Sequence, residues 1–397
     1  MSAKTAASSA TVVERQSFYR PELDGLRFLS FLAVFVSHAY LIHPRMFAGA
    51  GPIGTELGRW ALAAGHCGYA AVAVFFVLSS YLITELLLRE NERNGKIDVP
   101  AFYARRALRI WPLYFFFLIL TLLLEPRLGM PGIPAADAPW YLAFLGNWQI
   151  VWNGQIPRSA AQILWTVAIE EQFYLFWPLL VVLVSPKRLG WMCALLLVLG
   201  QVSRLALVAS GAPFYAIHFH TCVQFDAIAW GGLLAVAVRN GAFANWPRLA
   251  RQAMFGGGVV LAVATQLLLA EDKPFAAWPV AAYPLFAIAA LLVVAGAMRN
   301  GNESSLLIHP WLVRLGKISY GLYIWHLLAI VLIYKFGWCR PQSVWTSFYA
   351  LPVTIGLAEL SYQWIERPFL RWKEQFSRAT VSTTTPIDAA KPVIAET

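Results

Sequence analysis

The sequence is poor in charged residues. Only 13% of its 397 residues are Asp, Glu, Lys or Arg, whereas soluble domains carry about 25%. Hydrophobic residues make up 59% of the chain, which excludes a large soluble domain and predicts an integral membrane protein. The net charge of +10 does not indicate nucleic-acid binding, because the basic residues gather in alternate loops, as membrane topology requires.

The sequence motifs of several common sites are also missing. Its four cysteines are scattered without CxxC or metal-ligand spacing, so we expect packing residues and no metal site. His218 and His220 form only a weak metal-ligand pair. No P-loop, GxGxxG fingerprint or GxSxG elbow is present. Residues 1–18 are polar and lack the apolar region of a cleavable signal peptide, so none is expected.

Long apolar runs are the dominant pattern. A run of roughly 17 to 25 apolar residues can cross a bilayer as a helix. The sequence predicts an all-α integral membrane protein with about ten transmembrane helices. The loop near 126–162 is too short and too broken to cross, so we expect it to lie on the outer surface or re-enter. The ten predicted spans lie near 24–42, 68–88, 108–125, 163–184, 190–210, 223–239, 254–270, 278–298, 318–336 and 344–365.

Lys and Arg alternate between the loops in a way that predicts orientation. Of the 31 basic residues, 22 lie in one alternating set of loops and tails and six in the other. The positive-inside rule then places both termini in the cytoplasm. We expect a disordered tail over 1–18, a transmembrane domain over 19–373 and a cytoplasmic tail over 374–397.

The first predicted span carries two polar side chains. Burying such groups in a membrane costs free energy, so they indicate a functional or structural role. Arg27 and His38 are eleven residues apart, which at ~100° per residue places them on one helix face with a rise of roughly 16 Å. Asp24 is expected to cap this helix and to help fix Arg27. We interpret the other helices as the walls of a cavity that this face lines.

A second basic cluster, Arg105, Arg106 and Arg109, lies at the start of the third span. Arg106 and Arg109 are three residues apart and share a helix face. Guanidinium groups suit phosphate, but a positive-inside anchor or a contact with anionic lipid explains the same cluster. Arg27, at the same membrane surface, favours the phosphate interpretation.

The fourth span contains Glu170 and Glu171 at a depth similar to that of His38. A carboxylate there could orient and stabilise a histidine acting as general base, although a transporter's proton relay would need the same groups. His326, in the ninth span, is more typical of a structural hydrogen bond. For Asp226, helix capping, helix pairing and catalysis stay open.

Six motifs in order resemble the acyltransferase-3 family of integral membrane O-acyltransferases. That family modifies polysaccharides, lipopolysaccharide, peptidoglycan and some macrolides. One departure is Ser80, where the family usually has glycine. The matching stretches are Leu23–Arg27 with Arg-x10-His to His38, Phe75–Thr84, Arg106-x-x-Arg109, Trp165–Pro178, Ile318–His326 and Tyr362–Pro368.

The resemblance implies roles for particular residues. His38 matches the family's catalytic histidine, and Arg27, Arg106 and Arg109 match its donor-handling arginines. Arg105 is included beside them as a candidate donor contact. The chain also resembles the stand-alone form of the family, without a fused extracytoplasmic domain.

The implied reaction moves an acyl group, most often acetyl, from cytoplasmic acyl-CoA to a hydroxyl of a cell-envelope glycan or glycolipid. A small natural product such as a macrolide is the alternative acceptor, and a proton-coupled transporter is the alternative class. We expect a multi-pass protein of the cytoplasmic (inner) membrane that contacts lipids, without a metal or nucleic acid.

Overall fold

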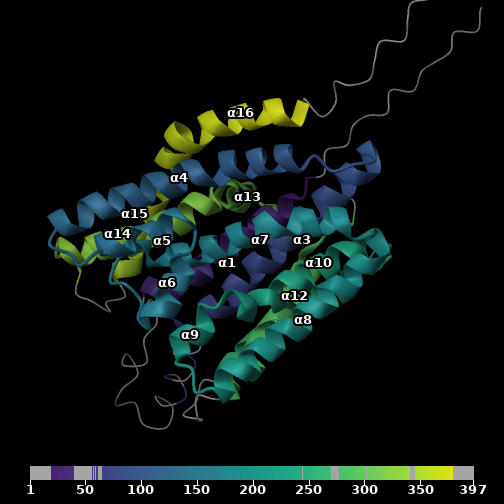
Figure 1. Ribbon diagram of the computed structural model, residues 1–397, viewed down its shortest axis with the longest axis horizontal. Coiled ribbons are helices and arrows are strands. Elements are labelled where there is room, and N and C mark those ends of the chain that lie inside the picture. The colour runs from purple at the N-terminus through teal and green to yellow at the C-terminus, as the bar shows by residue number, and fades with distance from the viewer. Residues whose placement is uncertain are drawn as a thin grey trace, which may run out of the picture.

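Helices form all the regular structure in the described residues, which contain no strand (Figure 1). The computed structural model describes residues 19–39, 56, 58, 60, 65–243, 245–269, 277–300, 303–339 and 345–378. The predicted tail 1–18 and most of the predicted tail 374–397 lie outside these ranges. Helix α16 continues to Arg378, past the predicted domain boundary at residue 373.

Ten of the longer helices correspond to the ten predicted spans, and one more follows the last span at Arg367–Arg378. Short helices lie in the loops between them. The long helices are α1 (Pro21–Ala39), α3 (Gly68–Asn94), α4 (Val99–Arg127), α7 (Leu164–Leu183), α8 (Pro186–Ala209), α10 (Phe225–Arg239), α11 (Arg248–Leu269), α12 (Ala277–Ala297), α14 (Ser319–Lys335), α15 (Trp345–Ser361) and α16 (Arg367–Arg378). The shorter elements are η2 (Ala135–Asp137), α5 (Ala138–Leu142), α6 (Gly146–Asn153), η3 (Ala160–Ile163), α9 (Phe214–His218), η4 (Thr221–Gln224), η5 (Leu306–Ile308), α13 (Pro310–Lys317) and the π-helical turn η6 (Tyr362–Glu366).

In the described part of the chain, six helices are long and apolar enough to cross a membrane: α3, α4, α7 with η3, α8, α10 with η4, and α12. A seventh candidate is the pair α13 and α14, which is bent by 74°. The protein is therefore a multi-pass helical membrane protein. Each of the ten predicted spans overlaps a helix. Helices α1, α11 and α15, however, are not among those that are long and apolar enough to cross a membrane. In α1 the charged side chains of Glu22, Asp24 and Arg27 lower the hydropathy, and α15 has only 17 residues. The count of ten stays a prediction.

Helix α1 lies inside the bundle and packs against α3, α13 and α14 (Figure 1). Glycines allow the closest approaches. A Cβ atom on Gly316 of α13 would meet the backbone of Asp24, and one on Gly231 of α10 would meet the carbonyl oxygen of Val77 in α3. The backbone of α1 is thus held at a fixed position against its neighbours, which fixes where Arg27 and His38 lie.

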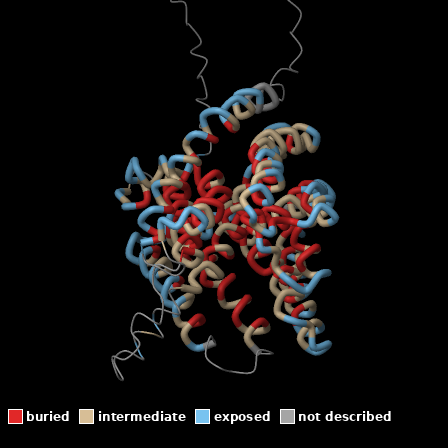
Figure 2. Tube along the Cα trace, turned by 90° about the vertical axis from the view of Figure 1, so that its left-hand side faces the viewer, coloured by how far each residue is buried: buried red, intermediate tan, exposed pale blue. Residues whose placement is uncertain are grey.

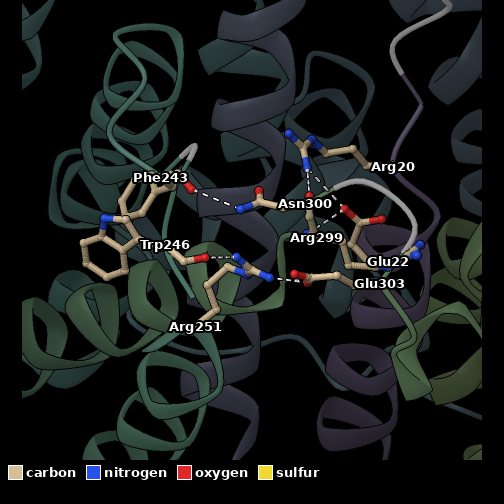
Figure 3. A network of polar contacts seen from close by, with 8 residues as sticks. All are labelled: Arg20, Glu22, Phe243, Trp246, Arg251, Arg299, Asn300 and Glu303. Atoms are coloured by element: carbon tan, nitrogen blue, oxygen red, sulfur yellow. Dashed lines mark hydrogen bonds and ion pairs between the residues drawn. The ribbon is translucent and has the colours of Figure 1, made fainter. Parts of the chain in front are cut away.

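A polar network joins the start of α1 to the loop after α12 and to the hairpin between α10 and α11 (Figure 3). Glu22 accepts hydrogen bonds from Arg20 and from the backbone N–H of Arg299, each at 3.3 Å. Arg251 contacts both Glu303 and the Trp246 carbonyl, and Asn300 donates to the Phe243 carbonyl at 3.4 Å. The network ties three chain segments together at the Arg27 end of α1.

Burial is concentrated in the middle of the bundle, and exposed residues lie around it (Figure 2). The outer face of α8 exposes large apolar side chains, among them Trp191, Val198 and Val202. In a membrane protein such a face contacts lipid, so its exposure needs no partner protein. Helix α16 lies on the outside of α4 (Figure 1).

We predict opposite effects for two glycine-to-alanine changes. Gly231→Ala forces α10 away from α3 and should cost about 1–3 kcal/mol. Gly256→Ala, on α11 with no atom within 4 Å of its added Cβ, should be neutral or stabilise by up to ~1 kcal/mol through helix propensity. The measurement is the temperature at which detergent-solubilised protein loses its monodisperse peak in size-exclusion chromatography. Equal midpoints for the two variants would contradict the close contact.

Candidate functional site

A small cavity of about 120 Å³ lies among α1, α3, α4, α7 and α14. We call it the arginine cavity, because Arg27, Arg106 and Arg109 all line it. Glu170 is the one carboxylate among its lining residues in the described part of the chain. The structure thus brings together three predicted arginines from two helices, and it leaves them with an excess of positive charge.

Arg27 is held in place by the first turn of α1. Its Nη1 atom lies 3.0 Å from Oδ1 of Asp24, and Tyr19 donates to Oδ2 of the same carboxylate at 2.9 Å. Burial, with the nearby carboxylate of Asp24, raises the pKa of Tyr19 to about 12, so the phenol keeps its proton at neutral pH. The prediction that Asp24 fixes Arg27 is confirmed. The predicted cap is wrong, because the helix begins at Pro21 and Asp24 lies inside it.

Arg106 lies between two aromatic rings. Its guanidinium carbon is 5.4 Å from the ring centre of Phe102 and 5.8 Å from that of Tyr174. Its buried Nε atom has no hydrogen-bond partner among the residues that the structure describes. A buried donor without a partner is costly, so the site fits a ligand that brings an acceptor oxygen.

Arg105 does not share this cavity. Its Nη2 atom pairs with Oε2 of Glu90 at 2.9 Å, which links α4 to the end of α3. Adjacent residues on a helix point about 100° apart, so Arg105 and Arg106 face different surroundings. The geometry gives Arg105 a structural contact.

His38 forms a hydrogen-bonded pair with His326 of α14. The His38 Nδ1 and His326 Nε2 atoms are 2.8 Å apart, and the rings stack with centroids 5.1 Å apart. His326 Nδ1 lies 2.6 Å from the backbone carbonyl of Tyr323. A carbonyl only accepts, so Nδ1 of His326 carries the proton and its Nε2 accepts from His38 Nδ1. Neutral His38 therefore has its lone pair on Nε2, an atom that no described group hydrogen-bonds.

A larger cavity of about 450 Å³ contains His38 on its wall, and we call it the histidine cavity. Aromatic rings from α3, α7, α9, α12 and α14 line much of it, and the amides of Gln162 and Gln224 add polar groups. The rings hold one another: His218 stacks on Phe214 with centroids 5.2 Å apart and contacts Tyr283 through Nδ1. Besides the histidines, the aromatic lining residues are Tyr69, Trp165, Phe214, Phe219, Tyr283, Phe286 and Tyr323.

The predicted carboxylates lie elsewhere than expected. Glu170 lines the arginine cavity, and Glu171 accepts a hydrogen bond from Trp111 at 2.9 Å. Neither is among the lining residues of the histidine cavity, so the interpretation that one of them meets His38 is corrected. His326 occupies that place instead. Counting residues placed the two glutamates and His38 at a similar depth. It did not determine which face of α7 is turned toward α1.

The remaining polar groups noted in the sequence have structural partners. Asp226 forms an ion pair with Arg204 of α8 at 2.6 Å, as the helix-pairing alternative expects, and it also lines the histidine cavity. His218 and His220 do not converge, because His220 accepts from the Cys222 N–H at 3.2 Å. Within the described residues no group of three or more His, Cys, Asp or Glu side chains has a metal-binding arrangement.

The two cavities have part of their walls in common. Val72 of α3 and Tyr323 of α14 line both, so the single cavity expected along α1 is divided in two. Sequence reasoning passed over both residues because neither carries a charge. The only signal for Tyr323 was its place in the motif that ends at His326.

The fold and these cavities define a multi-pass membrane protein in which a cationic cavity adjoins a histidine-containing one. The family model described as "Acyltransferase domain" matches residues 20–360. The chain belongs to this family, acyltransferase-3, as its motifs indicated.

Curated relatives agree with this assignment. "Putative O-acetyltransferase SAR0937" of Staphylococcus aureus (strain MRSA252) is 26% identical over 398 residues, covering 92% of this chain and 61% of the relative. "O-acetyltransferase OatA" of Staphylococcus aureus (strain NCTC 8325 / PS 47) is 26% identical over 388 residues, covering 88% of this chain and 57% of the relative. The chain thus spans about three fifths of these relatives. No solved structure is significantly similar to it.

The Arg204–Asp226 pair gives a stability prediction. Both side chains are almost fully buried, with 0% and 5% exposed. Arg204→Leu leaves a buried carboxylate without its partner and should cost about 3–5 kcal/mol, whereas Arg204→Leu with Asp226→Leu should recover most of the loss. Thermal stability in detergent measures both. A double variant no more stable than the single one would show that the pair is not the cause.

Proposed function

We propose that this protein is an O-acyltransferase that moves an acetyl group from acetyl-CoA to a hydroxyl of a cell-envelope glycan or glycolipid. The observation that carries the proposal is the geometry of α1. Arg27 and His38 lie on that one helix, and they line two cavities with a shared wall. The names of the relatives support acetyl as the group that moves.

The donor enters at the arginine cavity. Arg27, Arg106 and Arg109 supply planar cationic forks for its phosphates. Ligand pockets usually measure about 300–1,000 Å³, and this cavity has only about 120 Å³. It therefore holds part of the nucleotide thioester, and the adenosine end stays outside. The pantetheine arm runs along α1, whose rise from Arg27 to His38 is roughly 16 Å.

The acceptor occupies the histidine cavity, whose volume of about 450 Å³ is within the ligand-pocket range. Flat aromatic walls suit the C–H faces of a sugar ring, and the amides of Gln162 and Gln224 suit its hydroxyls. These are the features by which we favour a carbohydrate-containing acceptor.

His38 acts as the general base. Its Nε2 lone pair takes the proton of the acceptor hydroxyl while the oxygen attacks the thioester carbonyl. The C–S bond breaks as the C–O bond forms, and the proton passes to the leaving thiolate, which gives an ester and free CoA thiol. The His38 Nδ1–H keeps its hydrogen bond to His326 throughout, so His326 orients the base in the way a carboxylate does in other dyads.

Glu170 acts in the arginine cavity, as a counter-charge that offsets part of the repulsion among the arginines before the donor binds. Glu171 and Arg105 hold helices through Trp111 and Glu90. The asymmetry of basic residues supports the cytoplasmic membrane as the location and the cytoplasm as the side of both termini.

Replacing His38 with alanine tests the assignment of the base. His38→Ala should lower acetyl transfer by about 10²–10⁴-fold. His220→Ala is the matched control, because His220 lines neither cavity and should leave transfer unchanged. The assay follows thiol release from acetyl-CoA and the ester mass on envelope glycans. Undiminished transfer by His38→Ala removes the assignment.

Replacing the arginines tests the donor site. Arg109→Ala removes a charged contact and should raise the KM for acetyl-CoA about 10- to 100-fold. Arg105→Ala, on the same helix but outside the cavity, should leave the KM near the wild-type value. Steady-state kinetics with purified protein distinguishes them. Equal KM values for the two variants would mean that the donor binds elsewhere.

A further inference from the structure

Two side chains separate the donor and acceptor cavities. Val72 of α3 and Tyr323 of α14 line the arginine cavity and the histidine cavity alike. A side chain with a cavity on each of its two sides forms the partition between them. Within the described residues, these two side chains mark the place where the two cavities adjoin.

Tyr323 is held in position on several sides. Its Oη atom accepts from Thr166 at 2.9 Å and lies 3.4 Å from the carbonyl oxygen of Ile163. Its ring meets that of Phe75 edge-on, with centroids 6.1 Å apart. Because α3, α7 and η3 all contact it, the ring is a fixed wall and does not turn freely.

The partition lies directly beside the histidine pair. The Tyr323 carbonyl accepts from His326 Nδ1, and the Tyr323 and His326 rings have centroids 5.5 Å apart. Val34 of α1, one turn before His38, lines the histidine cavity and belongs to the same apolar cluster as Tyr323. The shared wall and His38 therefore belong to the same cavity, and Tyr323 contacts the histidine that bonds His38.

We propose that Val72 and Tyr323 form a constriction that selects the length of the transferred acyl group and restricts it to short chains. This inference rests on the proposed function. In it the thioester carbonyl lies at the constriction, open to the acceptor oxygen on the His38 side, and the alkyl part of the acyl group is held between Val72 and Tyr323. Each additional methylene must fit between a β-branched side chain and a fixed ring, and a tight apolar site discriminates one methylene by about 10- to 200-fold.

Val72 forms the α3 side of the proposed constriction. Its neighbours on α3 provide a matched control for a substitution of Val72. Val72, Phe75 and Ser79 follow helical spacing and face the arginine cavity together. Val74 lies on the same helix, is equally apolar and is buried with 7% exposed, but it lines neither cavity. Val72→Ala widens the constriction, and Val74→Ala makes the same truncation away from it.

The experiment compares acetyl-, propionyl- and butyryl-CoA as donors for purified wild type, Val72→Ala, Val72→Ile and Val74→Ala. Thiol release and the mass of the ester formed are measured for each. We expect Val72→Ala to raise the butyryl-to-acetyl ratio of kcat/KM at least about tenfold. Val72→Ile, which keeps the core filled, should lower the propionyl-to-acetyl ratio, and Val74→Ala should keep both ratios.

The outcomes separate this inference from the function on which it rests. A wild-type protein that transfers acyl groups, with ratios unchanged in both Val72→Ala and Val72→Ile, overturns the constriction and leaves the proposed function intact. The same change of ratio in Val74→Ala also overturns it, because the effect would then come from general loosening of α3. A wild-type protein that releases thiol from none of the three thioesters overturns the proposed function itself.

Discussion

The arrangement depends on one constraint: polar groups buried on α1 must find partners inside the bundle, since the membrane provides none. Arg27 finds Asp24 one turn earlier on its own helix, and His38 finds His326 on α14. The first pairing is local, and the second requires α1 and α14 to pack at one position and one rotation. The close approach at Gly316 and the polar network at the start of α1 hold that position.

The division into two cavities solves a problem that any membrane acyltransferase faces. An open passage from one side to the other would admit water to the thioester and let ions leak. In the proposed reaction, Val72 and the Tyr323 ring lie between the donor and the acceptor, because both side chains line both cavities. The constriction that we propose would limit the size of the acyl group, so selectivity and insulation would come from the same two side chains.

Much of the local structure was predictable from the sequence, and the failures have a common cause. Arg27 and His38 lie on one helix as predicted, and Arg106 joins Arg27 as their charges indicated. Either Glu170 or Glu171 was expected to meet His38, because residue counting put them at a similar depth in the membrane. Counting gives the position along a helix axis, but the rotation of α7 about its axis is set by packing against its neighbours. The same limit hid the partner of His326: the sequence indicated a structural hydrogen bond for this residue but not that it forms with His38.

What the sequence determined by itself is the set of properties that repeat along the chain: apolar runs of spanning length, alternating basic loops, the helical face shared by Arg27 and His38, and the motifs of the acyltransferase-3 family. Tertiary structure alone decided the His38–His326 pair, whose members are 288 residues apart, and the wall between the cavities. The physical reason is that the periodicity of a sequence relates only residues that are one or two helical turns apart. Contacts between helices depend on how the whole bundle packs.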